Sequence, residues 1–191
     1  MLSNQEALAV FLDSGALMEG HFKLTSGRHS NQYMQCAQLL KYPDMTEKVV
    51  SNLTEQFKDD HIDIVIGPAM GGIIVAYEAA RQLGKPAIFT ERENGVMALR
   101  RGFQIQPGQR VLVVEDVITT GGSVKEVIDV VEKLGGIVAG VGVLVDRSNG
   151  QVTFGVKQTA VLTMDITSWQ QADCPLCKEG KTEAIKPGSR S

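Results

Sequence analysis

An acidic pair followed by a turn rich in hydroxyl groups and glycine is the part of this sequence best suited to chemistry. Glu115 and Asp116 follow the valine-rich run 110–114, and a helical pattern begins at Ser123. Backbone N–H groups at such a turn and at a helix N-terminus bind anions, which the helix dipole also favours. The two carboxylates would repel a phosphate, so they suit ribose hydroxyls or the water shell of a metal ion. We therefore expect a sugar phosphate to be held at both ends by Glu115, Asp116, Val117, Ile118, Thr119, Thr120, Gly121, Gly122 and Ser123.

Two common phosphate-binding loops are absent from the sequence. It contains no G-x-x-x-x-G-K-[ST] stretch, which argues against a P-loop triphosphatase, and no G-x-G-x-x-G after the strand, which argues against a dinucleotide fold. The alternative is an ordinary solvated turn at the end of a buried strand. Two adjacent carboxylates followed by Thr-Thr-Gly-Gly-Ser are difficult to explain in that way.

Length and composition predict one globular domain in a reducing compartment. The chain has 191 residues, of which 43% are hydrophobic and 21% charged, with three cysteines and a net charge of −3. This charge argues against a nucleic-acid-binding surface. No apolar stretch is long enough to cross a membrane, and the N-terminal residues 1–11 lack the basic cluster of a signal peptide. We expect a cytoplasmic protein with neither nucleic-acid nor membrane partners.

Strand and helix patterns alternate along most of the chain. Such alternation predicts an α/β fold whose parallel sheet is covered on both faces, with ligands beyond the carboxyl ends of the strands. Three candidate site segments fall at such ends: 67–72, 91 onward and 115–123. The predicted helices are 4–14, 43–57, 72–83 and 123–134, the extended segments are 20–25, 31–40, 62–66, 86–90, 111–114 and 137–145, and the tail from about 173 is expected to be irregular.

The acidic turn resembles the phosphoribosyl-pyrophosphate (PRPP) signature of type I phosphoribosyltransferases. The chain as a whole resembles the orotate phosphoribosyltransferases of that family, through residues 24–30 (Leu-Thr-Ser-Gly-Arg-His-Ser), residues 67–72 (Gly-Pro-Ala-Met-Gly-Gly) and the late pair Asp146-Arg147. The resemblance implies a mostly parallel sheet flanked by helices, with an N-terminal hood at about 1–42, a core at about 43–170 and an irregular tail at 171–191. It also implies transfer of phosphoribose from PRPP to orotate, aided by Mg²⁺ held through PRPP, in a homodimer with shared active sites.

A second anion-binding turn is predicted at residues 67–72, between a strand and a helix. Ala69, Met70 and Gly71 are the candidate contacts to the pyrophosphate of PRPP. Family members often carry a lysine here, so backbone amides must contribute more in this chain. The alternative is a tight turn whose glycines serve packing alone.

Residues 91–103 are interpreted as a long connection, which in compact domains is typical of a mobile lid. Arg92 is a candidate PRPP contact, while Arg100 and Arg101 are candidate catalytic residues that close over the pyrophosphate. The resemblance implies that this loop reaches the partner subunit's site. Taken singly, each arginine is equally explained as a solvated surface charge.

The remaining substrate contacts are assigned by the resemblance. Arg147 is expected to pair with the orotate carboxylate, oriented by Asp146, and Thr119 to contact the ring. Tyr33 and Met34 are expected to line the orotate pocket. Lys23 is the candidate that replaces a family lysine at the position of Thr25, because residues two apart share a strand face. His21 and His29 flank this stretch and are interpreted as structural or surface groups.

Cys174 and Cys177 have the spacing of a zinc-binding pair, but zinc sites need four ligands. Two such pairs meeting across a two-fold axis would supply them. The alternative is two partly buried thiols at a turn in the tail. A redox pair is disfavoured because no thioredoxin-like pattern surrounds it.

Two other functions compete with orotate transfer. A purine phosphoribosyltransferase would not need the fixed cation that Arg147 offers to a carboxylated substrate. A PRPP-binding regulator without catalysis would need a nucleic-acid element, and residues 1–66 contain no basic recognition helix.

Overall fold

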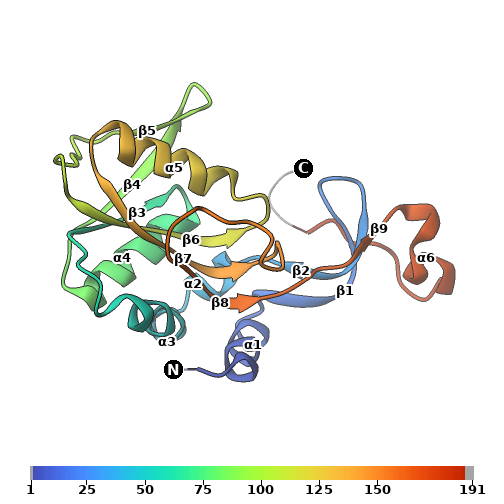
Figure 1. The fold of residues 1–191 in the computed structure, drawn as a ribbon. Helices are drawn as coiled ribbons and strands as arrows, with labels where there is room; N and C mark the ends of the chain where they lie inside the picture. The colour runs from blue at the N-terminus through green and yellow to red at the C-terminus, as the bar shows by residue number, and fades with distance from the viewer. Residues whose placement is uncertain (1, 188–191) are drawn as a thin grey trace.

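The computed structural model describes residues 2–187, which form two sheets of different size (Figure 1). The larger sheet has the strand order β5-β4-β3-β6-β7-β8, and the smaller sheet has the order β1-β2-β9. The strands are β1 (Leu17–Lys23), β2 (His29–Met34), β3 (Ile64–Pro68), β4 (Ala87–Glu93), β5 (Val96–Leu99), β6 (Arg110–Ile118), β7 (Ile137–Asp146), β8 (Gln158–Thr163) and β9 (Ser168–Trp169). The helices are α1 (Asn4–Asp13), α2 (Ala37–Leu40), α3 (Pro43–Thr54), α4 (Gly71–Leu83), α5 (Gly122–Lys133) and α6 (Pro175–Glu179), with 3-10 turns η1 (Glu55–Phe57) and η2 (Gln171–Asp173).

The larger sheet is parallel except at β5, which pairs antiparallel with β4. Its central strands are continuous apolar runs, as expected for strands buried on both faces. One apolar cluster joins the sheet to α1, α3 and α4, and a second joins its other face to α5. The expected α/β fold, with a mostly parallel sheet flanked by helices, is confirmed.

The carboxyl ends of the central strands point toward the smaller sheet (Figure 1). The segment after β2 reaches one of these ends, because the thiol of Cys36 lies 3.7 Å from the backbone oxygen of Asp116 in β6. The smaller sheet takes its third strand, β9, from far beyond the predicted hood at 1–42. A site at the carboxyl ends therefore lies under a cover contributed by both ends of the chain.

The predicted helices are present to within three residues, but several segments differ from expectation. The extended segment 20–25 ends at Lys23 and becomes a turn, so Lys23 and Thr25 do not share a strand face, and β8 and β9 were not expected. The extended segment 31–40 ends at Met34 and continues into α2. The long connection 91–103 is largely a β-hairpin that turns at Asn94 and Gly95, both with positive φ. An Asn-Gly pair is a strong local signal for a hairpin, so the long-loop prediction for 91–103 was wrong at these residues. The tail contains η2 and α6, so it is not wholly irregular, while Met1 and residues 188–191 of the predicted hood and tail lie outside the described residues.

Within residues 2–187, no helix has the length and apolar character that a membrane crossing requires.

Candidate active site

The turn after β6 forms an open cradle at the N-terminus of α5. Gly121 takes a left-handed conformation, with φ of 71°, and no side chain caps the helix. The N–H groups of the first helical turn have no partners within a helix, so they remain available to an anion. A cavity of about 80 Å³, larger than the roughly 30 Å³ share of one water, is lined by Glu115 and residues 117–124. The geometry suits a phosphate group.

The acidic pair lies inside β6 rather than after it, because the strand continues to Ile118. Successive strand residues face opposite sides, so Glu115 is buried while Asp116 is partly exposed. Burial raises the pKa of the Glu115 carboxyl well above its ordinary value, and the adjacent Asp116 raises it further. Glu115 therefore favours the neutral form, which can donate a hydrogen bond as well as accept one. The two carboxyl groups offer a sugar different hydrogen-bonding capacities.

The turn between β3 and α4 packs directly against the acidic pair. An ideal β-carbon on Gly71 would lie 2.2 Å from Oδ2 of Asp116, and one on Gly72 would lie 3.2 Å from Oε1 of Glu115. The N–H of Ala69 donates to the backbone oxygen of Thr90, the Ala69–Met70 peptide is cis, and no side chain caps α4. Two uncapped helix N-termini thus flank one pair of carboxyl groups.

Arg147 follows β7 and lies beside the cradle, since its N–H donates to the backbone oxygen of Ile118. Its guanidinium is partly buried, which lowers its pKa, while Cys36 and Tyr33 act in the opposite direction. Its buried Nε has no hydrogen-bond partner among residues 2–187. A desolvated, unpaired guanidinium is a strong candidate for binding an anionic ligand.

Asp146 does not orient Arg147 as expected. Its carboxylate instead accepts hydrogen bonds from the N–H and hydroxyl of Ser148, at 2.7 and 2.6 Å, and from the N–H of Gly150. Asp146 therefore orders the loop after Arg147.

The other predicted substrate contacts occupy different environments. Tyr33 packs its ring 5.9 Å from that of Phe22 and interacts electrostatically with Arg147. Met34 is buried in the apolar cluster that contains α1, α3 and α4. Lys23 is exposed at the end of β1. The contacts of Met34 and Lys23 with substrate remain predictions.

The three arginines of segment 91–103 contact glutamates rather than the acidic pair. Arg92 pairs with Glu126 of α5 at 2.6 Å. Arg101 donates two hydrogen bonds to Glu91, and Arg100 lies 3.2 Å from Glu93. For any of these arginines to bind substrate or act in catalysis, its side chain must leave its glutamate partner and contact the ligand.

The structure places His21 and His29 beside the tail cysteines, and both histidines are buried. From the sequence, both histidines were expected to be structural or surface groups, and the missing zinc ligands were expected from a second chain. No local pattern links them to the cysteines, because 153 residues separate His21 from Cys174.

A family model described as "Phosphoribosyl transferase domain" matches residues 36–170. The orotate phosphoribosyltransferase of Pelotomaculum thermopropionicum is 60% identical over 189 residues, covering 99% of each chain. That of Heliobacterium modesticaldum is 59% identical over 192 residues, covering 100% of each chain. Among solved structures, the orotate phosphoribosyltransferase of Aeropyrum pernix has a TM-score of 0.66 at 31% identity, covering 82% of this chain and 92% of that chain. The matching family model and the identity of these relatives over the full chain show that the chain belongs to the orotate phosphoribosyltransferases of the type I phosphoribosyltransferase family.

Proposed function

We propose that this chain transfers the phosphoribosyl group of PRPP to orotate, releasing pyrophosphate and forming orotidine 5′-monophosphate. One observation carries the proposal beyond family membership. The partly buried Arg147 has an unpaired Nε and lies beside the cradle at the end of β6. The carboxylate of orotate supplies the negatively charged partner that this guanidinium lacks, whereas a purine has no carboxylate.

PRPP is held along the carboxyl ends of β3 and β6. Its 5-phosphate binds in the cradle, through the hydroxyls of Thr119, Thr120 and Ser123 and the N–H groups at the start of α5. The ribose hydroxyls bind Asp116 and Glu115. The pyrophosphate lies at residues 69–71, where the second uncapped helix begins beside Asp116.

Orotate binds between the cradle and the smaller sheet. The guanidinium of Arg147 donates hydrogen bonds to the orotate carboxylate. Tyr33 and Thr119 contact the pyrimidine ring of orotate. The buried setting of Arg147 strengthens this pairing, because water competes less for the charges.

The reaction breaks the bond from ribose C1 to pyrophosphate and forms a bond from C1 to the ring nitrogen of orotate, which gives up its proton to the departing pyrophosphate or to solvent. The sugar passes through an oxocarbenium-like state, so nearby negative charge is stabilising and water must be excluded. Asp116 supplies such charge next to the sugar and fixes its hydroxyls.

Magnesium is the proposed cofactor. The oxygen donors of the acidic pair, facing an anion cradle, fit a hard cation that keeps several waters and binds mainly through PRPP. Bound there, Mg²⁺ would offset the charge of the departing pyrophosphate.

A homodimer in the cytoplasm is also proposed. Met70, Ile74 and Tyr77 are 82%, 44% and 67% exposed. Their spacing places them on one face of α4, which suits burial against a second copy. The β4–β5 hairpin projects from the body of the molecule (Figure 1), and the segment that follows its base carries Arg100 and Arg101, which would contact the partner subunit's pyrophosphate. Three free thiols suit a reducing compartment.

The decisive experiment follows the ultraviolet absorbance of orotate in the presence of PRPP and Mg²⁺. The absorbance should fall when the protein is added and should stay constant without PRPP. Constant orotate absorbance, together with turnover of adenine or hypoxanthine, would replace the orotate assignment with a purine. No turnover of any base, with PRPP still bound, would identify a binding protein.

A further inference from the structure

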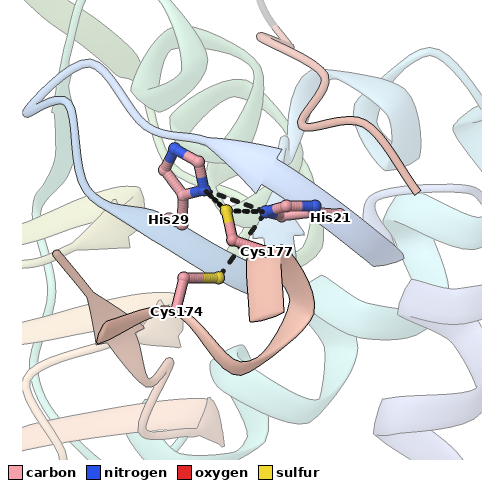
Figure 2. Close-up of side chains that lie close together, drawn as sticks. All are labelled: His21, His29, Cys174 and Cys177. Carbon is pink, nitrogen blue, oxygen red and sulfur yellow. Dashed lines mark hydrogen bonds between the residues drawn. The ribbon is translucent and has the colours of Figure 1, made fainter. Parts of the chain in front are cut away.

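Four side chains that bind transition metals converge between the smaller sheet and the tail. They are His21 of β1, His29 of β2, and Cys174 and Cys177 at the start of α6, and Figure 2 shows all four directed toward one another. One nitrogen or sulfur atom from each lies within 4.8 Å of the others. We propose that these residues bind one Zn²⁺ per chain, in a structural site separate from the active site.

Three of the distances between ligand atoms match the edges of a tetrahedral zinc site. Zinc bonds of about 2.0–2.1 Å to nitrogen and 2.3 Å to sulfur place neighbouring ligand atoms about 3.3–3.8 Å apart. The sulfurs of Cys174 and Cys177 both lie 3.6 Å from Nε2 of His21, and the sulfur of Cys177 lies 3.3 Å from Nδ1 of His29. The two nitrogens are 2.8 Å apart, so a bound ion would separate them slightly.

A hydrogen bond at the second ring nitrogen of His21 favours metal binding by the first. Its other nitrogen, Nδ1, lies 2.9 Å from the backbone oxygen of Thr182. A proton on Nδ1 donates to that oxygen and leaves the lone pair of Nε2 directed at the cluster. Metal-binding histidines commonly have such a partner, which fixes both the tautomer and the ring orientation.

The hairpin geometry explains why both histidines face the same side. Lys23 pairs directly with His29, and His21 lies two residues before Lys23 on the same strand. The register of β1 shifts between Glu19 and Phe22, and the hairpin still brings the two rings together, since Nε2 of His21 lies 2.8 Å from Nδ1 of His29. The Cys-x-x-Cys spacing then brings two sulfurs from a single turn.

The donor set selects the ion. Two thiols and two imidazoles favour zinc over magnesium, which prefers oxygen ligands. Four protein ligands fill a tetrahedral shell and leave no position for substrate, as in structural rather than catalytic sites. A cavity of about 340 Å³ bordered by His21, His29, Cys177 and residues 180–184 gives the ion an access path.

The tail needs such a cross-link because it has little apolar packing. Neither η2 nor α6 contributes a buried residue, and Cys174 between them is fully buried. Beyond α6, backbone hydrogen bonds join Ile185 to His21 and Lys23. Zinc would fasten the tail to the β1–β2 hairpin, whose turn at residues 24–28 is expected to shape the substrate pocket. This last effect rests on the proposed function, whereas the metal site does not.

Metal content of the untagged, full-length protein tests the site directly. We expect one zinc per chain, and loss of nearly all zinc from His29→Asn and Cys177→Ser. His61→Asn is the matched control, because His61 is exposed and pairs with Asp63 outside the cluster. Zinc-free protein that takes up neither Zn²⁺ nor Co²⁺ would overturn the proposal, as would equal zinc in the His29 and His61 variants.

A second measurement avoids variants that fail to fold. Removing the ion from wild-type protein with a chelator should make trypsin cleavage after Lys178 and Lys181 roughly tenfold faster, and added Zn²⁺ should reverse the change. Co²⁺ in its place should give the absorption of tetrahedral cobalt bound to thiolate. An unchanged cleavage rate after complete zinc removal would refute the structural role. Because none of these readouts uses orotate, they remain valid if the proposed reaction is wrong.

Discussion

Gly71 lies directly against the carboxylate of Asp116. A β-carbon on Gly71 would lie 2.2 Å from Oδ2, whereas ordinary contacts of a β-carbon begin at 3.4 Å. Any side chain at this position must displace the Asp116 carboxylate by about 1 Å, either by rotating that side chain or by moving the β3–α4 turn. The absence of a side chain on Gly71 therefore sets the spacing between the proposed pyrophosphate turn and the carboxylate that holds the ribose.

Gly71→Ala should lower kcat/KM for PRPP by about 100-fold, the cost typical of a 1 Å misplacement at a reacting centre. Steady-state kinetics at saturating orotate measures this loss. Arg81→Ala, at the far end of α4, is the control, since its exposed ion pairs with Glu47 and Glu78 contribute little. Wild-type kinetics in Gly71→Ala would mean that the two turns do not share a ligand.

Arg147→Ala should raise the KM for orotate roughly 10- to 100-fold, because a hydrogen bond to a charged group contributes about 1.5–3 kcal/mol. The KM for PRPP should change little. Arg147→Lys should recover part of the loss, since an ammonium keeps the charge but lacks the planar pair of donors. Equal losses for both substrates would remove Arg147 from the carboxylate role.

Glu115 should make the ligand-free protein less stable as the pH rises. Burial raises the pKa of its carboxyl in the folded state, so its contribution is fully present below its ordinary value of 4.5. Above that pH the unfolded chain releases the proton while the folded chain retains it. The free energy of unfolding should then fall by up to about 1.4 kcal/mol per pH unit.

Urea unfolding between pH 5 and pH 8 measures this slope. Glu115→Gln should flatten it, because the amide does not titrate. Glu132→Gln on the exposed surface of α5 is the control and should keep the wild-type slope. Identical slopes for wild type and Glu115→Gln would show that the buried carboxyl does not resist ionisation.

Local sequence patterns predict much of the candidate site. The junction of β6 with α5 is contiguous in sequence, so glycine, hydroxyl and carboxylate residues at fixed offsets indicate it directly. The close approach of Gly71 to Asp116 has no such signature, because it depends on how two strands register side by side. Sequence therefore predicts which turns bind a ligand, and tertiary packing determines how closely they approach.

Long-range contacts account for most of what the sequence did not predict. Each histidine of the metal cluster looks ordinary alone, and the hairpin and tail meet only after folding. The sequence does not show that the arginines in and after the β4–β5 hairpin have partners, but in the structure they form ion pairs with Glu91, Glu93 and Glu126. The Asn94–Gly95 turn is the exception, because an Asn-Gly pair is a local signal that predicts a hairpin.

Tyr77→Glu should convert the proposed dimer to a monomer. A charge within an apolar interface lacks compensation once buried, which costs several kcal/mol in each subunit. Sedimentation at micromolar concentration measures the change, and Glu78, on a different face of α4, provides the control variant Glu78→Gln. A wild-type protein that sediments as a monomer would contradict the proposed assembly.

Shared active sites predict that two impaired variants restore each other when assayed at an orotate concentration well below the raised KM of Arg147→Ala. Arg101→Ala removes a charge donated to the partner subunit's site, whereas Arg147→Ala damages the site of its own chain. A mixed dimer then contains one site with both defects and one site with neither. Because random mixing of equal amounts makes half the dimers mixed, activity should return to about a quarter of the wild-type value.

Mixing must be carried out by co-expression or by refolding together, so that subunits exchange. Arg101 donates to Glu91 within its own chain, and mixing distinguishes action on that chain's site from action on the partner's site. Action within one chain gives no restoration, because each subunit of a mixed dimer retains its own defect. Restored activity together with dimeric sedimentation therefore establishes that Arg101 acts across the interface, and its absence would confine the hairpin to its own subunit.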